Sequence, residues 1–389
     1  MPSIDDAPRA PRKGGSRRVV RIGLVLIILV LLVGVVLTRF SPNDYSISPG
    51  GAQPVGPLIS IPQAPAQQGE GKILLTDVLL TKLNALSWLK AKLSSNTQIV
   101  PESALVEPGV SASQLDAQGY LEMAQSKDAA RYAALRTLGY TVPATNAGAV
   151  IDAVASGSPA DPALSVADVI VGADGKKIKT SCGFIRAFHD VNPGTKISLS
   201  VERATISGSG TITYGSPSPI VLTTAPRPST DVGGAGCPGA SGAPKSYLGI
   251  SIQTFVSYQF PITVAISTPN IGGPSAGLAM TLGIIDKLSA GTLLHGQTIA
   301  ATGTISPDGA VGDVGGVPQK GVSVLHEGAS VFLVPVGEVG PAKSLAGSSL
   351  HAVAVGTLNQ ALAQLMRQGG TIKLANGTVE THLPATSAS

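Results

Sequence analysis

Ser275 is the residue of this sequence whose type and surroundings best suit nucleophilic chemistry. It lies in the stretch Gly-Gly-Pro-Ser-Ala-Gly, residues 272–277, which follows an apolar run at 261–267. A strand, a glycine turn and a proline at the first helical position predict a serine on the first turn of a helix, where backbone N–H groups lack intrahelical partners. Such N–H groups can stabilise an oxyanion, although glycine-flanked serines that merely start helices are common. The turn residues expected to form the oxyanion site are Gly273, Pro274 and Ala276.

A serine nucleophile needs a base, for which the chain offers histidines and one lysine. Three histidines follow Ser275 outside any recognisable Ser-His-Asp arrangement, and lone histidines are more often surface or core residues: His295, His326 and His351. Lys320 follows a glycine-rich turn at the start of a helix-like run. To act as a base it must lose its proton, so its pKa has to fall from about 10.4 towards 7, roughly 4 kcal/mol. On spacing alone, the sequence favours a solvated lysine at a helix start.

Three blocks of sequence together resemble the proteolytic domain of Lon proteases. They are Gly-Pro-Ser-Ala-Gly at 273–277, Thr-Gly-Thr-Ile-Ser-Pro-Asp-Gly-Ala-Val-Gly-Asp-Val-Gly-Gly-Val-Pro-Gln-Lys at 302–320, and Gly-Ala-Ser-Val-Phe-Leu-Val-Pro at 328–335. Residues 247–340 match nearly continuously. The resemblance implies a Ser-Lys dyad in which Ser275 is the nucleophile, Lys320 the general base and Thr302 the hydroxyl that orients the lysine. One departure is Gly272, because Lon enzymes commonly carry an acidic residue at this place.

Residues 140–204 resemble a bacterial PDZ domain. The matching blocks are Gly-Ser-Pro-Ala at 157–160, Ala-Asp-Val-Ile-Val-Gly-Ala-Asp-Gly at 167–175, a helix-like run at 182–189 and Pro-Gly-Thr-Lys-Ile-Ser-Leu-Ser-Val-Glu at 193–202. A PDZ domain binds an extended peptide as an added strand at an open sheet edge. The carboxylate-binding loop would be residues 142–148, where Pro143 removes one N–H donor. Capture of carboxyl termini is therefore left open.

The Lon resemblance extends to Gly-Lys-Ile-Leu-Leu-Thr-Asp-Val-Leu-Leu at 71–80 and Met-Ala-Gln-Ser-Lys-Asp-Ala-Ala-Arg at 123–131, which look like the first strands and first helix of that domain. We therefore expect an α+β fold: a Lon-type proteolytic domain with an inserted PDZ-like β-rich domain, preceded by one transmembrane helix. Residues 73–80 should then pair in one sheet with residues 262–266 or their neighbours. The expected segments are a cytoplasmic basic tail (1–21), a transmembrane signal anchor (22–38), a spacer (39–56), the N-terminal part of the catalytic domain (57–139), the PDZ domain and following hairpin (140–228), a linker (229–244), the Lon-like protease domain (245–368) and a C-terminal tail (369–389).

Residues 22–38 form an uncharged apolar run of 17 residues, which spans roughly 26 Å as a helix. We interpret it as an uncleaved signal anchor; the alternative is a cleaved signal peptide, for which no small-x-small cleavage site follows. The six basic residues before it predict a cytoplasmic N-terminus and an extracytoplasmic catalytic part, in a single-pass protein of the cell membrane.

The rest of the chain carries 21 basic and 21 acidic side chains and has no net charge, which argues against nucleic acid as a partner. No G-x-x-x-x-G-K-[ST] phosphate loop occurs, so we expect no ATP. Two cysteines, Cys182 and Cys237, lack the spacing of a metal site, and the sequence leaves open whether they form a disulfide.

Taken together, these observations predict an ATP-independent serine endopeptidase, a hydrolase without cofactors, that cleaves exported or membrane proteins. The PDZ domain would present or gate the substrate, and the Lon resemblance also suggests a homo-oligomer. One alternative is a membrane-tethered PDZ adaptor whose Lon-like domain is a non-catalytic scaffold. Another is an acyl-transfer enzyme that uses the same dyad.

Overall fold

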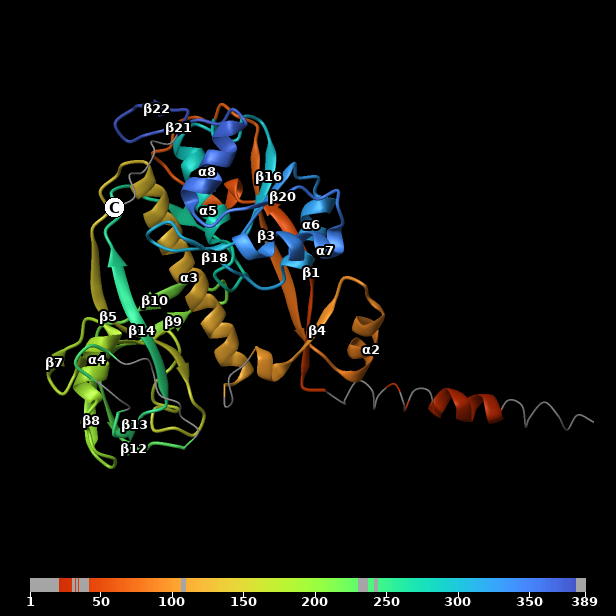
Figure 1. Ribbon diagram of the computed structural model, residues 1–389. Coiled ribbons are helices and arrows are strands. Elements are labelled where there is room, and N and C mark those ends of the chain that lie inside the picture. The colour runs from red at the N-terminus through yellow and green to blue at the C-terminus, as the bar shows by residue number, and fades with distance from the viewer. Residues whose placement is uncertain are drawn as a thin grey trace, which may run out of the picture.

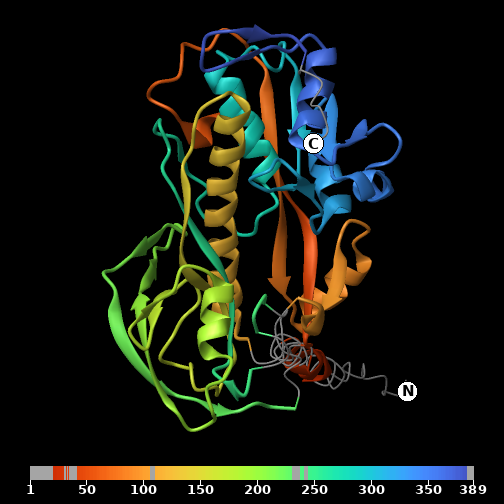
Figure 2. The same cartoon turned by 60° about the vertical axis from the view of Figure 1, so that its left-hand side comes forward.

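The computed structural model describes residues 21–29, 32, 34, 42–105, 110–229, 237–240 and 244–382. The chain folds into two lobes, each built around a six-stranded sheet (Figure 1). The large lobe contains the sheet β20-β19-β16-β3-β1-β4, and the small lobe contains the sheet β11-β8-β6-β5-β14 with β7 beside β6. The long helix α3 (Ala112–Thr137) runs along both lobes (Figure 2).

The sheet of the large lobe joins segments from both ends of the chain. Its strands are β1 (Asp44–Pro54), β3 (Lys72–Lys82), β4 (Gln98–Pro101), β16 (Thr298–Ala301), β19 (Val331–Val334) and β20 (Ala352–Ala354). β3 pairs antiparallel with β1 and parallel with β16, so a strand that precedes the small lobe in sequence lies beside one that follows it. The two parts of the chain therefore form one lobe, and the small lobe is inserted between them.

Two details of this sheet differ from the sequence expectations. Residues 44–54 were expected within a spacer, but they form β1, which pairs with β3 from Tyr45 opposite Lys82 to Pro54 opposite Leu74. The expected pairing of residues 73–80 in one sheet with residues 262–266 or their neighbours is wrong. β15 (Ala265–Ile266) pairs with β2 (Ile59–Ser60), while β3 uses both its edges for β1 and β16.

Helices cover both faces of this sheet because β3 is apolar on both sides. Ile73 and Leu75 point into the core that contains α3, α5 (Gly277–Leu288) and α8 (Leu358–Arg367), whereas Leu74 packs with α6 (Val317–His326) and α7 (Val339–Ala346). This division follows from the two-residue repeat of a strand. The remaining elements of this lobe are α2 (Ala85–Leu93), β17 (Thr304–Ile305), β18 (Val311–Gly312), β21 (Ile372–Lys373) and β22 (Val379–Glu380), with 3-10 turns at Gly56–Leu58, Glu102–Ala104 and Val336–Glu338.

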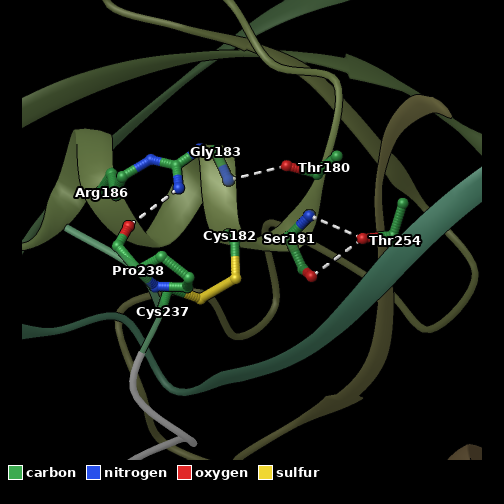
Figure 3. The surroundings of a disulfide bond; sticks show 8 residues. All are labelled: Thr180, Ser181, Cys182, Gly183, Arg186, Cys237, Pro238 and Thr254. Atoms are coloured by element: carbon green, nitrogen blue, oxygen red, sulfur yellow. Dashed lines mark hydrogen bonds between the residues drawn. A yellow bond between two sulfur atoms is a disulfide. The ribbon is translucent and has the colours of Figure 1, made fainter. Parts of the chain in front are cut away.

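The small lobe has its own apolar core beneath a short helix. Its elements are β5 (Ala144–Val154), β6 (Val169–Ala173), β7 (Lys176–Lys177), α4 (Ser181–Phe188), β8 (Lys196–Glu202), β9 (Ala204–Ile206), β10 (Ile212–Tyr214), β11 (Ser218–Thr223), β12 (Ala225–Pro226), β13 (Ser246–Tyr247) and β14 (Ile250–Tyr258). Phe184 and Phe188 of α4 pack against the sheet. A disulfide joins Cys182 to Cys237, which decides the pairing that the sequence left open (Figure 3).

One strand of the small lobe comes from a segment that was expected in the protease domain. β14 lies within the range 245–368 assigned to that domain, yet it pairs with β5 and extends the small lobe's sheet. Residues 372–380, expected in the C-terminal tail, form the hairpin of β21 and β22, and Ile372 is buried in the core of the large lobe.

The predicted transmembrane segment is described only in part. Residues 21–29, 32 and 34 are helical, whereas the rest of the range 22–38 and all of residues 1–20 lie outside the described residues. Within the described part of the chain, no helix has the length and apolar character needed to cross a bilayer.

Candidate active site

Ser275 lies at the end of a tight loop that leads into α5. The sequence pattern placed it on the first helical turn, with Pro274 at the first helical position, but α5 begins only at Gly277. The loop depends on Gly273, whose φ of +83° belongs to the left-handed region that glycine adopts without strain. Its N–H donates to the Gly119 carbonyl of α3 at 2.8 Å. The Ser126 hydroxyl, also on α3, donates to the Pro274 carbonyl at 3.0 Å. The long helix therefore holds the loop from outside the motif.

The other side of the loop is held by the segment that follows β16. The Gly303 N–H and the Thr302 hydroxyl both donate to the Ser275 carbonyl, at 2.9 and 3.3 Å. Leu278 of α5 donates in turn to the Gly303 carbonyl at 3.1 Å. Ser275 is thus fixed through its backbone, whereas within the described residues its hydroxyl forms no hydrogen bond with another protein group.

Thr302 lies where β16 ends, between two parallel neighbours. It is fully buried, and its N–H donates to the Leu333 carbonyl of β19 at 3.0 Å. Its hydroxyl donates to the Ser275 carbonyl and accepts a hydrogen bond from the Lys320 ammonium at 3.1 Å. A single side chain at the carboxyl end of the sheet therefore connects the two residues that the sequence singles out.

Lys320 lies on the first turn of α6 and is only 1% exposed. The helix begins after Gly316, which adopts a left-handed φ of +69°. A Cβ at this glycine would come within 2.7 Å of Val78 on β3, so the start of α6 can approach the sheet only with glycine here. The solvated-lysine interpretation is therefore wrong: the start of the helix faces the sheet rather than water.

Burial changes the proton affinity of Lys320. It lowers the pKa of the ammonium to about 8, because the charged form loses its hydration inside the protein. The carboxylates of Asp77 on β3 and Glu338 favour the charged form and oppose part of this shift. Burial also raises the pKa of Glu338, with a further contribution from Asp313. The balance leaves about a tenth of the lysine neutral at pH 7.

The turn provides fewer free N–H groups for an oxyanion than the sequence predicted. The Gly273 N–H is already bonded to Gly119, and Pro274 has no N–H. Within the described residues, the backbone N–H groups of Ser275 and Ala276 donate to no protein acceptor. Of the three turn residues named from the sequence, Ala276 alone can supply an oxyanion donor, and Ser275 adds a second.

Gly272, where Lon enzymes commonly carry an acidic residue, lies against the backbone of α3. A Cβ at this position would come within 3.3 to 3.4 Å of the Cα, carbonyl carbon and oxygen of Gly119. The absence of a side chain at 272 therefore allows the nucleophile loop and the helix to meet backbone to backbone.

Sequence reasoning missed three contributions to this site. Gly119 and Ser126 bind the nucleophile loop from α3, and Asp77 acts on Lys320 from β3. Ser126 belongs to the block at 123–131 that resembles Lon, so a signal was present, although it did not indicate a role. Within the described residues, none of the three histidines hydrogen-bonds to Ser275 or Lys320, and no group of His, Cys, Asp and Glu side chains is arranged to hold a metal ion.

Comparison with known proteins agrees with both lobes. Residues 244–366 match the Lon protease (S16) C-terminal proteolytic domain, and residues 136–209 match the PDZ domain family. No curated protein matches the chain.

Among solved structures, the chain is similar to PDZ domains of SdrC-like proteins. The one from Listeria monocytogenes has 17% identity and a TM-score of 0.21, over 28% of this chain and 90% of that chain. The one from Listeria innocua has 17% identity and a TM-score of 0.20, over 27% of this chain and 92% of that chain. The PDZ match covers β5 to β9 of the small lobe, and the Lon match covers the chain from β13 into α8. The chain thus combines a PDZ domain with an S16 proteolytic domain, as a PDZ-containing Lon-like protease does.

Proposed function

We propose that this protein is an ATP-independent serine endopeptidase with a Ser-Lys dyad. Ser275 is the nucleophile, Lys320 the general base and Thr302 the hydroxyl that orients the lysine. The observation that carries the proposal is the buried Lys320 ammonium, which binds a threonine that also binds the nucleophile's own carbonyl. A lysine enclosed in this way has a lowered pKa, as a general base near neutral pH requires.

The chemistry follows from these positions. Neutral Lys320 removes the proton of the Ser275 hydroxyl, and the serine oxygen attacks the carbonyl carbon of the peptide bond. The oxyanion then accepts hydrogen bonds from the N–H groups of Ser275 and Ala276. Protonated Lys320 gives its proton to the leaving amine, which breaks the C–N bond and leaves an acyl-enzyme. Water, deprotonated by the same lysine, hydrolyses that ester.

One movement completes this geometry. The Ser275 hydroxyl forms no hydrogen bond with Lys320 among the described residues, whereas the backbone around it is held on both sides. In this proposal the serine side chain turns towards the lysine when substrate binds. Such tightening on substrate binding is common, because catalytic hydrogen bonds in substrate-free enzymes are often long.

The proposed substrates are unfolded or exposed segments of exported or membrane proteins, and the PDZ domain presents or gates them. In this proposal residues 22–38 anchor the chain in the cell membrane, with residues 1–21 in the cytoplasm and the catalytic part outside. The uncharged apolar run and the basic residues before it support this orientation. Assembly of several copies is part of the same proposal and rests on the Lon resemblance.

Hydrolysis of casein by the full chain in detergent tests the dyad. We expect Ser275→Ala and Lys320→Ala each to abolish cleavage, with Ser349→Ala and Lys373→Ala, at exposed positions, as matched controls. Thr302→Val, which keeps the shape but removes the hydroxyl, should lower kcat at least tenfold, while Thr302→Ser should retain most of the activity. Residual activity in Lys320→Ala equal to that of the wild type would rule out the dyad.

The rival function is a PDZ adaptor with a non-catalytic scaffold, and the same assay separates the two. An adaptor would show no cleavage in the wild type, and Ser275→Ala would change nothing. An acyl-transfer enzyme would require Ser275 and Lys320 but would yield products in which the acyl group is joined to an acceptor other than water. Mass spectrometry of the casein fragments distinguishes this outcome from hydrolysis.

A further inference from the structure

Helix α2 carries a stripe of leucines on the face that points away from the protein. Leu86, Leu89 and Leu93 recur at spacings of three and four residues, which places them on one side of the helix. They are 38%, 52% and 81% exposed, whereas Ala91, on the opposite side, is the buried residue of the helix. A surface helix of a globular protein normally has the reverse arrangement, with its apolar side towards the core. We call these three residues the leucine stripe.

Lysines border the leucine stripe on both sides. Lys90 and Lys92 are exposed, and they lie about 70° and 90° around the helix from the middle of the stripe, in opposite directions. Between Asp77 and Glu102 the sequence contains three lysines and neither aspartate nor glutamate. The third, Lys82, forms an ion pair with Glu102. An apolar stripe bordered by lysines is typical of a helix that lies in a membrane interface, since lysine side chains can extend from the apolar layer to the headgroups.

α2 is fixed to the residue at which β1 begins. The Trp88 indole N–H donates to the Asp44 carboxylate at 3.0 Å, and the Leu83 N–H donates to the Asp44 carbonyl at 2.9 Å. A capping box at Asn84 and Ser87 fixes the first turn of the helix. β4, which follows α2, pairs with the same end of β1. The leucine stripe therefore has a fixed direction relative to the start of β1.

The start of β1 is close in sequence to the apolar run at 22–38, which the proposed function places in the membrane. The six residue steps from Thr38 to Asp44 span at most about 22 Å when fully extended. A helix with its side chains is about 10–12 Å across, so a helix fixed to Asp44 can reach the headgroups. Figure 1 shows α2 and β4 together at one end of the large lobe, opposite the end that carries β21 and β22.

The charges around the leucine stripe favour lipid over a second copy of the chain. In a two-fold contact the same surface meets itself, so lysines would face lysines, and residues 78–101 contain no acidic side chain to pair with them. Anionic headgroups supply the complementary charge, and the boundary of the acyl chains supplies an apolar environment for the leucines.

We propose that α2 lies on the outer surface of an anionic lipid bilayer. The leucine stripe enters the boundary between headgroups and acyl chains, and Lys90 and Lys92 contact the headgroups. This contact is a second attachment beside the anchor, and it fixes how the large lobe stands on the membrane. The inference goes beyond the cleavage chemistry and rests on the membrane placement in the proposed function.

Quenching by spin-labelled lipid tests the position of α2 in the full-length protein. Leu93→Cys is labelled with the fluorophore NBD without reductant, because the two native cysteines form a disulfide. The vesicles contain phosphatidylcholine, phosphatidylglycerol and a lipid with a nitroxide near the headgroup end of its acyl chain. Val379→Cys, which replaces an apolar side chain that is 58% exposed on β22, is the matched control. We expect at least threefold more quenching at position 93 than at position 379, and equal quenching would overturn the proposal.

The lysines and the lipid charge give a second comparison. Lys90→Gln/Lys92→Gln in the Leu93→Cys protein should lower the quenching at least twofold, and so should vesicles of phosphatidylcholine alone. Lys72→Gln/Lys373→Gln, at two exposed lysines outside α2, should leave it unchanged. Quenching that responds to neither change would overturn the role of anionic headgroups. Leu93→Cys chains that cross-link to one another on oxidation and are not quenched would show that a second copy covers the stripe, which would also overturn the proposal.

Failure of this inference can be told apart from failure of the proposed function. Casein cleavage in detergent measures the dyad without a bilayer, and Leu89→Ser should cleave within twofold of the wild type. Resistance of the wild type to extraction by alkaline carbonate measures the anchor. A chain that carbonate removes from the vesicles would refute the anchor, while the two labels compared before extraction still decide whether α2 contacts lipid.

Discussion

Thr302 connects the two residues that carry the proposed chemistry. Its hydroxyl has one proton and two lone pairs, and it uses them to donate to the Ser275 carbonyl and accept from Lys320. Its own backbone is held by β19. The base is therefore positioned by a residue of the sheet, while the nucleophile belongs to a loop between the sheet and α5. A rigid strand end is better suited to this role than a loop would be.

The lowered pKa of Lys320 predicts the pH dependence of cleavage. The base must be neutral, and the pKa of about 8 means that the neutral fraction grows roughly tenfold between pH 7 and high pH. We expect kcat/KM for a short fluorogenic peptide to rise with pH through a single step near pH 8 and then level off. A rate that falls across this step would contradict a lysine base, and the profile of casein cleavage by the same preparation checks that the step does not depend on the peptide.

Burial of Lys320 also predicts a pH-dependent stability that can be measured without any substrate. The pKa of this lysine is lowered in the folded chain, so between about pH 8 and 10.5 the unfolded chain binds more protons and stability rises with pH. Below pH 8 the folded chain bears the full free-energy cost of keeping the charged lysine buried. Lys320→Met removes it, so we expect the variant to unfold at a higher free energy at pH 7, by about 3 kcal/mol at most.

Denaturant titrations at pH 7 and pH 10.5 check this expectation. The difference in unfolding free energy between the variant and the wild type should nearly disappear at pH 10.5, because the buried lysine is then neutral, as the methionine that replaces it always is. Lys373→Met is the matched control, because that lysine is exposed and its removal should leave stability almost unchanged at both values. A Lys320→Met variant less stable than the wild type at pH 7 would mean that the lysine is not held at a cost to folding.

The main residues of the site could be predicted because their signals are local. The serine lies in a six-residue motif, and the lysine and threonine lie in one block. Spacing alone favoured a solvated lysine, and it was the resemblance of these blocks to Lon proteases that gave the lysine and the threonine their expected roles. Gly119 carries no such signal, and the Lon-like block that contains Ser126 indicated no role for this residue. Each contacts the nucleophile loop across more than a hundred residues of sequence. The Gly273 N–H was expected to bind an oxyanion, but only the position of α3 reveals that it is already used.

At the scale of the elements, α3 is the helix that the site and the small lobe share. A capping box at Ser111 and Gln114 fixes its start, and its 26 residues give a length of about 39 Å. Leu135 and Leu138 near its end are fully buried in the large lobe, whereas Leu121 is buried against the small lobe. Gly119 and Ser126, on either side of Leu121 in the helix, contact the nucleophile loop. The helix is thus placed to transmit the position of one lobe to the other.

The contact between Gly119 and Gly272 predicts opposite effects for two similar substitutions. A Cβ at Gly119 would lie 3.6 Å from the nearest atom, an ordinary contact, whereas a Cβ at Gly272 would lie 3.3 Å from backbone that cannot easily move. Since alanine is favoured over glycine inside a helix, we expect Gly119→Ala to retain activity and to raise stability by up to about 1 kcal/mol.

Gly272→Asp, which introduces the acidic residue common in Lon enzymes, should push the loop away from α3. We expect it to lower kcat several-fold rather than raise it, with Gly272→Ala between the two in effect. Casein cleavage and thermal unfolding of the three variants, measured side by side, check the order. Higher activity in Gly272→Asp than in the wild type would mean that the loop can accommodate a side chain and that the missing acid limits the site.

β14 marks the limit of what a linear pattern can predict about elements. Its alternating residues indicated a strand, and the Lon resemblance of the sequence after residue 247 assigned it to the protease domain. The structure pairs it with β5 instead, because the insertion places the open edge of the small lobe next to the chain as it returns. Periodicity predicts that a segment is a strand, but it carries no information on which edge the strand will join.

At the scale of the whole molecule, the sequence predicted that one domain is inserted into the other, but it did not predict that β1 belongs to the sheet of the large lobe. The blocks before and after the PDZ-like region resembled parts of one domain, and β3 does lie beside β16. β1 was hidden within a stretch rich in proline, glycine and serine, which resembles a spacer in composition. Pro49, Gly50 and Gly51 lie inside β1 at the place where its register against β3 shifts, between Pro49 and Ala52. The irregular pairing therefore accommodates the residues that made this stretch resemble a spacer.

The disulfide predicts how the two lobes depend on one another. Cys182 and Cys237 are separated by 55 positions, and closing a loop of that length restricts the unfolded chain by up to about 4 kcal/mol in the chain-entropy model. We expect Cys182→Ala/Cys237→Ala to lower the melting temperature of the small lobe. Calorimetry of the full chain in detergent measures this change. The wild type should match the variant once reductant is added, and the variant itself should not respond to reductant.

The same variant tests whether the small lobe controls the active site. Loss of the disulfide frees the segment that leads to β14, so β14 should exchange its amide protons faster, and casein cleavage should fall while Lys320 and Ser275 are untouched. Unchanged cleavage together with faster exchange in β14 would mean that the nucleophile loop is held by α3 and Thr302 alone. Slow exchange in β14 despite the missing disulfide would instead mean that the pairing with β5 and the contacts of Phe255 and Tyr258 suffice to keep the strand in place.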